Sequence, residues 1–499
     1  MNEQREHEMW VNRLIDAATC GWVVDLRFGV PVRQYDPATA DQWPADRCIP
    51  ASALRTVLLG DHTGFDPRGL RIAGARITGD VDLAHITFDY PLHMIRCRID
   101  RPIVFDAAKL AELDLTASHI RKLSLDGATI AGGLFAKGIT TDGEIRARVA
   151  TIGSQLNLSS AHLNNPGTDA LNLSNGRIAG DVFVGDSVTA TGKLDFRADS
   201  TISAVRTHFE GRVSLDGAKP PSSGYLVVNF EGAVIERLTL PPDSLAGIVL
   251  SLAKISHLDT PTDREPSYPV LATGWTIGDV TGRIRTDHAA ATRWLNSIHK
   301  KMDNFSPQPW HALATVYERN GHPAEARRLR FTAANKVTKN APLPTKILRT
   351  IYLAVAGHGY YPLFAAVWLI IAPIAGVALV GANRAHFVPT TPVVVADTVT
   401  ASATGVNKAA PTGQTEEQPV TVTGADDCAS HPTYPCLDTF TYALTGVIPA
   451  ATGITRPDWA VSTTAPVWMK LGIPALRILA WIFTAILLAG VTGLLRKSS

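Results

Sequence analysis

Two cysteines in the second half of the chain have a spacing that suits a covalent bond. Cys428 and Cys436 are separated by seven residues, ASHPTYP. A pair of this kind forms a small disulfide loop when it lies in an oxidising space outside the cytoplasm. We therefore predict a disulfide between Cys428 and Cys436. The other cysteines, Cys20, Cys48 and Cys97, are predicted to be buried thiols on the cytoplasmic side.

Histidines and aspartates recur at fixed places in a repeated segment. They are His85, His119 and His162, each before an aliphatic residue, and Asp80, Asp114, Asp126 and Asp181, each beside a turn. A functional interpretation of the histidines is an outward-facing ladder along one side of the fold. The structural alternative, which we favour, is an exposed corner that accepts any polar residue. The aspartates are typical turn formers, because their side chains hydrogen-bond to nearby backbone, and we favour this over acid–base pairs.

Motifs for catalysis are absent from the sequence. It contains no phosphate-binding P-loop, no G-x-S-x-G, no H-E-x-x-H and no strand–GxGxxG–helix pattern. It also contains no C-x-x-C, and no histidine–cysteine cluster has metal-ligand spacing. The formal net charge of +2 gives no support to a nucleic-acid partner. We predict no catalytic, cofactor-binding or metal-binding residue.

A repeat between about residues 70 and 260 predicts the elements that carry these side chains. The clearest units are LDLTASHI at 113–120 and LSLDGATI at 123–130. A first inward set recurs every five positions, at Leu110, Leu115, Ile120, Leu125, Ile130 and Phe135. A second set lies two residues earlier, at Ala108, Leu113, Ser118, Leu123, Ala128 and Gly133. This period matches neither a helix nor a two-layer strand, and indicates a chain that turns a corner every five residues and stacks coil upon coil.

Turn residues support the stacked coil. Gly127, Gly176 and Gly180 follow Asp, Asn and Ala in the units, and we expect them at corners that need a positive φ. These units resemble the pentapeptide-repeat family, whose fold is a right-handed four-sided β-helix. The resemblance implies about nine coils and a rod on the order of 45 Å long. An ordinary β-sandwich is the alternative, but sandwiches do not keep a fixed unit length over many copies.

The exposed ends of a stacked coil need capping elements, and residues 1–65 are predicted to form the N-terminal cap. Residues 6–18 and 51–59 are expected to form short helices, and residues 22–26 a strand. The predicted fold class is mainly β: a right-handed β-helix, then an α-helical hairpin and two transmembrane helices. The predicted domains are the cap (1–65), the β-helix (66–262), a helical linker (283–345), the first span and its approach (346–383), a loop (384–470), and the second span with a basic tail (471–499).

Two uncharged apolar stretches are long enough to cross a bilayer, residues 360–382 and 478–495. Basic residues flank them: Lys336, Lys339, Lys346 and Arg349 before the first, and Arg496 and Lys497 after the second. The positive-inside rule then places both chain ends on the cytoplasmic side of the cell membrane. A pair of buried core helices is the alternative interpretation.

The loop between these stretches would face outward, and its first part, rich in Thr, Val, Ala and Pro, reads as flexible. Residues 437–454 within it are moderately apolar and too short to cross a bilayer. We favour an interfacial helix on the outer leaflet. The alternative is a re-entrant helix of the kind found in ion channels, although a T-V-G-Y-G filter is absent.

The linker contains a match to one tetratricopeptide repeat. The matching positions are Trp310, Leu313, Ala314, Tyr317, Gly321, Ala326 and Ala333. One repeat cannot bury its apolar face alone, so it must pack on a preceding helix, on the end of the β-helix or on a partner. Arg327, Arg328 and Arg330 are favoured as a solvated face. The alternative is that they bind anionic lipid headgroups.

Nearly the whole chain resembles a set of bacterial membrane proteins labelled "membrane-associated oxidoreductase". The matching segments are WVVDLRFG (22–29), GARITGDVDL (74–83), WHALATVYERNGHPAEARRL within the helical linker (310–329), YYP (360–362) and LDTFTYALTGVIP (437–449). The label implies redox chemistry, but these motifs are structural.

The sequence thus favours a membrane-anchored cytoplasmic scaffold that binds lipid and a protein partner along the β-helix or the helical linker. An oxidoreductase is the first alternative. An oligomeric channel-like protein, assembled through the spans around residues 437–454, is the second.

Overall fold

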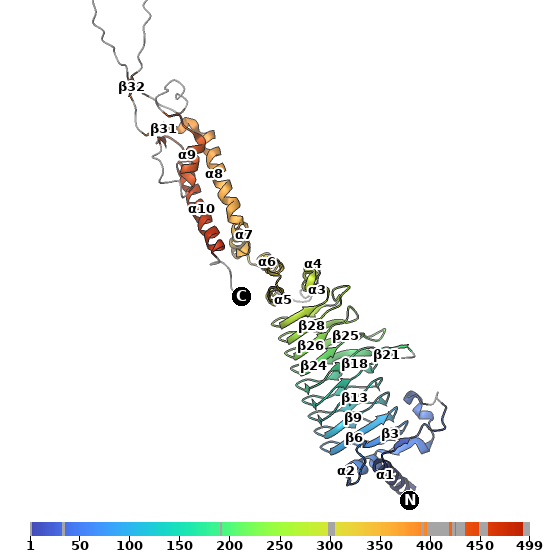
Figure 1. Cartoon of the computed structure of the whole chain (residues 1–499). Helices are drawn as coiled ribbons and strands as arrows, with labels where there is room; N and C mark the ends of the chain where they lie inside the picture. Colours follow the sequence, from blue (N-terminus) through green and yellow to red (C-terminus); the bar gives the residue numbers. More distant parts are fainter. Residues whose placement is uncertain are drawn as a thin grey trace, which may run out of the picture. The chain divides into compact units, whose positions relative to one another are not determined.

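The computed structural model describes residues 2–31, 35–189, 192–297, 305–390, 394–396, 419–421, 425, 435–448 and 458–492. The chain forms two compact units, Met1–Ala333 and Ala334–Ser499. The first is a β-solenoid of about ten coils with helices at its ends, and the second contains two apolar helices (Figure 1). The predicted fold class, mainly β with a solenoid, C-terminal helices and two candidate membrane helices, is confirmed.

The N-terminal cap is built into the first coil. Helices α1 (Asn2–Cys20) and α2 (Ala51–Leu59) contain the two predicted helices. Trp10 and Leu14 of α1 are buried in the solenoid core. Strand β1 (Val23–Asp25) pairs with β3, and β2 (Cys48–Pro50) pairs with β4. Because both cap strands are hydrogen-bonded, they cover the first edge of each sheet. The short helices η2 (Pro37–Gln42) and η3 (Ala45–Arg47) lie between them.

The solenoid has four short strands per coil in its middle part. The strand pairs that stack its coils are parallel, and they form two 14-stranded sheets. After one coil the chain returns to a position directly above its earlier path, and residues stacked in this way form a column. Arg98 therefore lies beside His119, 21 residues later in the sequence, and Asp126 bonds Arg148, 22 residues later. A four-sided coil is what a corner every five residues predicts.

The two sheets divide the strands as follows. The first contains β1, β3 (Leu70–Ala73), β6 (Thr87–Ile95), β9 (Lys109–Asp114), β12 (Thr129–Ile130), β13 (Leu134–Phe135), β16 (Thr151–Ile152), β17 (Leu156–Asn157), β19 (Arg177–Ile178), β20 (Val182–Phe183), β24 (His208–Ser214), β26 (Val234–Thr239), β28 (Lys254–Asp259) and β30 (Thr276–Thr281). The second contains β2, β4 (Arg76–Thr78), β5 (Val81–Asp82), β7 (Arg98–Ile99), β8 (Ile103–Val104), β10 (His119–Ile120), β11 (Leu123–Ser124), β14 (Thr140–Thr141), β15 (Ile145–Arg146), β18 (His162–Asn172), β23 (Arg197–Ser203), β25 (Leu226–Asn229), β27 (Gly247–Val249) and β29 (Val270–Leu271). An antiparallel hairpin, β21 (Ser187–Thr189) and β22 (Gly192–Leu194), projects from one coil.

Aliphatic columns fill the interior of the solenoid. One column runs through Ile99, Ile120, Thr141 and Leu163, all of them buried. Neighbours in a column are about 4.8 Å apart, so each side chain packs on the next. Burial of each aliphatic side chain contributes roughly 1.5–3 kcal/mol, and the repeat supplies many such residues.

The predicted inward sets hold up to Ile130 and fail at Gly133 and Phe135, where Leu134 and Ala136 take the inward places. Leu110, Leu115, Ile120 and Ile130 are buried as expected. Phe135 was expected to point inward, and this is wrong: Leu134 and Ala136 are buried, and Phe135 is only half-buried. The ring of Phe135 instead covers Gly133, where an added Cβ would lie 2.7 Å from its Cζ. The extra residue after Ile130 shifts the inward positions by one.

Two corner columns hold left-handed residues. The first contains His85, Ala107, Gly127, Val149, Asn175, Arg206, Gly232, Leu252 and Gly274, and the second contains Gly74, Arg96, Ala117, Gly138 and Ser160. The positive φ predicted for Gly127 is confirmed. The predictions for Gly176 and Gly180 are wrong, because Asn175 takes the left-handed position in one turn and neither glycine has a positive φ. Those glycines allow close backbone contact: a Cβ at Gly180 would lie 2.7 Å from the Ser154 carbonyl carbon.

The solenoid continues past the predicted end at residue 262, because β29 and β30 add another coil. Helices α3 (Arg283–Thr286), α4 (His288–Ser297), α5 (Gln308–Arg319) and α6 (Pro323–Asn340) follow. Helix α5 packs on β30. The Gln308 side chain bonds the Trp275 carbonyl at 2.8 Å, and Asn320 bonds Asp279 at 2.8 Å. Of the three possibilities for the linker, its helices thus pack on the end of the solenoid.

The second unit begins within α6, at Ala334, and continues with α7 (Leu343–Ala356) and the short helix η5 (Gly357–Gly359). Helices α8 (Phe364–Ala382) and α10 (Val467–Val491) lie side by side, and α9 (Thr439–Val447) packs on both (Figure 1). At the loop end of this hairpin, the short helix η6 (Arg384–His386) leads into β31 (Phe387–Pro389), which pairs with β34 (Trp459–Val461). Strands β32 (Val394–Ala396) and β33 (Pro419–Thr421) form a second antiparallel pair.

Candidate functional site

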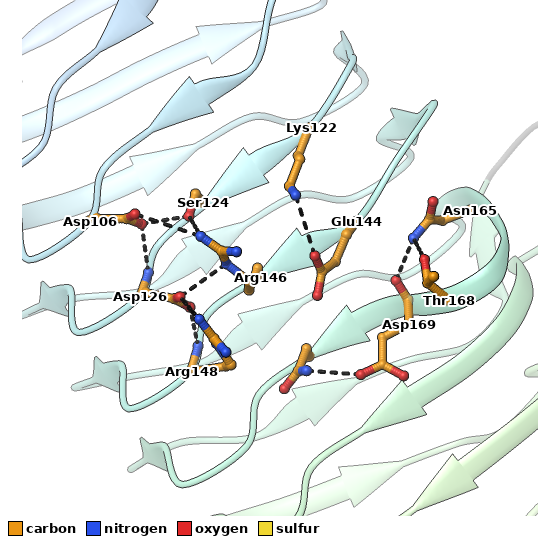
Figure 2. Close-up of polar contacts among 11 residues, drawn as sticks. Asp106, Lys122, Ser124, Asp126, Glu144, Arg146, Arg148, Asn165, Thr168 and Asp169 are labelled. Carbon is orange, nitrogen blue, oxygen red and sulfur yellow. Dashed lines mark hydrogen bonds and ion pairs between the residues drawn. The ribbon is translucent and has the colours of Figure 1, made fainter.

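A set of ion pairs crosses three coils of the solenoid, and we call it the Asp126 ladder: Asp106, Ser124, Asp126, Arg146 and Arg148 (Figure 2). Ser124 donates to Asp106 at 2.5 Å, and Arg146 Nη2 donates to Ser124 at 3.0 Å. Arg146 Nε and Arg148 Nη2 lie 2.9 and 2.6 Å from Asp126 Oδ2. The parallel register causes this arrangement, because it places equivalent residues of successive coils side by side.

Hydrogen bonds within the ladder lower the pKa of Asp126. Burial alone would raise the pKa of Asp126, but hydrogen bonds from the Arg148 side chain and backbone outweigh it, so the pKa lies below its usual value. Asp126 is therefore ionised at neutral pH and unsuited to donate a proton. It also accepts the Arg148 N–H one coil on, at 3.0 Å, so it connects two coils, whereas Asp114 accepts the Thr116 N–H within its own turn at 2.8 Å. The ladder is thus a network of ion pairs and hydrogen bonds that connects successive coils.

The pKa of Asp169, a second carboxyl near the ladder, is shifted in the opposite direction to that of Asp126. Burial, helped by the nearby charge of Glu144, raises the pKa of Asp169, while a hydrogen bond from Asn172 at 2.8 Å opposes the rise. Glu144 in turn faces Lys122 at 3.5 Å (Figure 2). A raised pKa is a feature of general acids, but structural networks raise pKa values too. No catalytic partner for Asp169 is identified among the residues that Figure 2 draws.

The histidines form a partial column. His119 and His162 share a column with Thr140 between them. His85 does not belong to it: its φ of 59° places it in the left-handed corner column with Ala107. His119 Nε2 lies 2.9 Å from Asp142 Oδ2, and its Nδ1 lies 2.6 Å from Arg98. His119 thus belongs to an ion-pair network, and the three histidines do not line one face.

A shallow pocket of about 410 Å³ lies near the C-terminal end of the solenoid, lined by Arg264, Glu265, Pro266, Ser267, Arg283, Arg293, Trp294 and Ser297. Each of its arginines has an acidic partner, since Arg264 meets Asp243 at 2.9 Å, and Arg283 and Arg293 meet Asp287 and Glu265. Its charges are thus neutralised within the chain. In the described ranges, no group of three or more His, Cys, Asp or Glu residues is arranged to hold a metal ion.

The basic residues predicted to lie near the membrane differ in exposure. Arg327 and Arg328 are exposed on α6, but Arg330 is half-buried and pairs with Glu318 at 2.7 Å. Lys346 is exposed on α7, where Arg349 is half-buried. The remaining two, Arg496 and Lys497, lie outside the described residues.

The cysteine predictions have mixed outcomes. Cys97 is buried, and burial raises the pKa of its thiol to about 12, so it is inert at neutral pH. Cys48 is half-buried, and burial raises its pKa. The prediction that Cys20 is buried is wrong, because it ends α1 at the surface. The disulfide between Cys428 and Cys436 stays a prediction, since Cys428 lies outside the described residues.

Two helices are long and apolar enough to cross a membrane, Phe364–Ala382 and Val467–Gly490. The first agrees with the predicted stretch at 360–382. The second begins before the predicted stretch at 478–495 and includes Lys470 and Arg477. The uncharged run at 478–495 begins after both cations and therefore leaves them out. The apolar residues at 467–476 on the other side of Arg477 were the signal that could have extended the helix.

Comparison with known proteins gives no assignment: no family model, no curated protein and no solved structure matches this chain.

Proposed function

We propose that this chain is a membrane-anchored scaffold, in which the solenoid presents charged faces to a protein partner and the helical hairpin holds the chain in the cell membrane. The observation that carries the proposal is the uncovered apolar surface of the hairpin. Only 22% and 17% of the most apolar windows of α8 and α10 are buried within the chain. Core helices of a soluble protein are mostly buried, whereas lipid covers such surfaces in a membrane.

Helix α7 supports the same proposal. Its Leu343, Ile347, Leu348 and Ile351 are all more than half exposed. At 100° per residue they share one side of the helix, whereas Thr345, Lys346, Arg349 and Thr350 occupy the other. A helix of 14 residues with so little burial is marginal in water. An anionic bilayer surface would cover its apolar side and attract its cations, which also favours cytoplasmic chain ends.

The Asp126 ladder is the surface we propose for the protein partner. Its five residues are held by ion pairs and hydrogen bonds within the solenoid, so binding would cost little ordering entropy. Arg148 remains half exposed and can form further contacts.

Alkaline carbonate extraction of membranes from cells that express the full chain tests the anchor. We expect the chain to remain with the membrane pellet, and a chain that lacks residues 364–382 and 467–490 to be released. Release of the full chain would overturn the proposal. A photo-crosslinking residue at Arg148, with Thr129 on another face as control, tests the ladder. A partner captured at both positions or at neither would remove the ladder from the proposal.

The oxidoreductase alternative rests on the family resemblance alone. It predicts that the purified full chain carries a flavin or haem absorption band. Such a band would replace the scaffold proposal with an enzymatic one.

A further inference from the structure

Helices α8 and α10 lie antiparallel in a register that several contacts fix. A Cβ added at Gly490 would lie 2.2 Å from Pro362, and one at Gly472 would lie 2.8 Å from Leu379. Between these levels, the rings of Trp368 and Phe483 stack with their centroids 6.0 Å apart. Interpolation between the contacts places Arg477 opposite Ala375, near the middle of α8. Arg477 therefore lies at mid-depth of any bilayer that the hairpin crosses.

Helix α9 starts at the loop end of the hairpin and ends at this same depth. Leu437, just before it, packs with Val380 and Met469, close to the loop end. Val447, its last residue, packs with Ala372 and Ala480. Nine residues of helix rise about 13 Å, roughly half the length of α8. The helix thus lies along one half of the hairpin.

Small residues allow this close packing. A Cβ at Gly376 would lie 3.0 Å from Val447, and one at Gly446 would lie 3.1 Å from Ile473. Ala443 is fully buried in the same contact. Glycine and alanine at such positions are typical of helix packing in membranes, where association depends on close contact between backbones. An interfacial helix on the outer leaflet would not need them.

Both ends of α9 have charged caps. Asp438 accepts a hydrogen bond from the Phe440 N–H at 3.0 Å at the start of the helix. Arg477 Nε donates to the Gly446 carbonyl at 2.7 Å near its end. The last carbonyls of a helix have no partner within it and carry the negative end of its dipole, so an anion at the start and a cation at the end both stabilise α9.

We propose that α9 is a re-entrant helix that enters the bilayer from the loop end and stops at mid-depth, and that Arg477 is the positioning residue that holds its inner end. The inference rests on the proposed membrane anchor. Carbonyl ends of half-helices inside membranes are places where transporters bind cations. In this chain the guanidinium occupies that place, which explains why a charged residue persists in the middle of a span.

Cysteine accessibility in the full chain tests the proposal, with the five native cysteines replaced by serine and the protein in liposomes. Thr441 and Thr445 are four residues apart on the same side of α9, so they form a matched pair. We expect a membrane-impermeant maleimide to label Thr441→Cys at the loop end and not Thr445→Cys. Equal labelling of both would overturn the re-entrant helix in favour of an interfacial one.

Ile370→Cys, on the exposed side of α8, separates this failure from failure of the anchor. Labelling at Ile370 would refute the anchor, whereas labelling at Thr445 with Ile370 protected would refute only the re-entrant helix. Arg477→Met should lower the melting temperature in detergent and open Thr445→Cys to labelling. Arg477→Lys should restore part of the loss, because it keeps the charge. Thr484→Val on the same helix should change neither readout, and an Arg477→Met chain equal to wild type would overturn the role of Arg477.

Discussion

The Ser118 hydroxyl connects two points of the preceding coil. It accepts a hydrogen bond from the Cys97 N–H at 2.8 Å and donates one to the Met94 carbonyl at 2.6 Å, and the residue is only 1% exposed. The sequence pattern places Ser118 in the second inward set. The structure adds that its hydroxyl satisfies two backbone groups that have no access to water.

Replacement of Ser118 by alanine should therefore destabilise the solenoid. Each buried group left without a partner costs about 1–3 kcal/mol, so we expect a loss of roughly 2–4 kcal/mol. Chemical denaturation followed by circular dichroism measures it. Thr129→Ala, at an exposed strand position, is the control and should change stability little. Equal effects of the two changes would contradict the role of the Ser118 hydroxyl.

Thr141 should respond in the opposite direction. It is fully buried in the aliphatic column between Ile120 and Leu163, and within the described residues its hydroxyl has no hydrogen-bond partner. A buried hydroxyl without a partner costs roughly 1–3 kcal/mol, so Thr141→Val should raise the free energy of unfolding by about that amount. Thr129→Val, again exposed, gives the baseline for the same chemical change. A loss of stability in Thr141→Val would indicate a hydrogen bond that this structure lacks.

Val149 has an unfavourable backbone conformation. Its φ is 58°, and its neighbours in the corner column are Gly127 and Asn175, residues that accept this conformation. The left-handed conformation costs an ordinary residue roughly 1–2 kcal/mol, and Val149 is 62% exposed, so little packing would be lost. Val149→Asn should therefore raise the melting temperature. Val234→Asn in β26, an extended position, should lower it, and the same sign for both changes would refute the strain argument.

The pH dependence of stability should reflect the Asp126 ladder. The pKa of Asp126 is lower in the folded chain than its usual value, so its stabilising effect is present above the unfolded pKa and is lost as pH falls through the folded pKa. Arg148→Ala should reduce that effect, and the part that remains comes from the backbone N–H of residue 148 and from Arg146. The difference in stability between wild type and variant should then be present at pH 7 and shrink towards acid pH. Arg206→Ala, which loses a bond to the neutral Asn175, should give a difference that does not depend on pH in this way.

The sequence predicted the coil well because each inward position repeats, and an error at one coil is outweighed by the others. It failed where a single residue departs from the repeat. Phe135 has the right spacing, yet the extra residue before Leu134 turns it outward. Gly176 looked like the left-handed residue of its turn, but Asn175 accepts that conformation as well.

The membrane unit shows a different limit. The uncharged run at 360–382 contains α8. The run at 478–495 begins only after Arg477, so the predicted span leaves out the first part of α10. The partner that makes this arginine tolerable, the Gly446 carbonyl, is 31 residues away in sequence. Periodicity and composition carry no information on such a contact. Composition therefore favours an interfacial helix for residues 437–454, because it carries no information on the packing of α9 against α8 and α10.

The apolar side of α7, which contains Ile347 and Ile351, should face lipid. In membranes from cells that express the full chain, a photo-crosslinking residue at Ile347 should react with lipid, because this side chain is 61% exposed and lies on the apolar side. The same crosslinking residue at Thr345, on the polar side, should not react with lipid.

Glutamate at Ile347 and Ile351 should also weaken the preference of the purified chain for anionic over neutral vesicles, since a carboxylate opposes both burial in the interface and attraction to anionic headgroups. Glutamate at Thr345 and Thr350 changes the charge equally and leaves the apolar side intact, so it should have the smaller effect. Protein adducts at Ile347, in place of lipid adducts, would show that another protein surface covers α7.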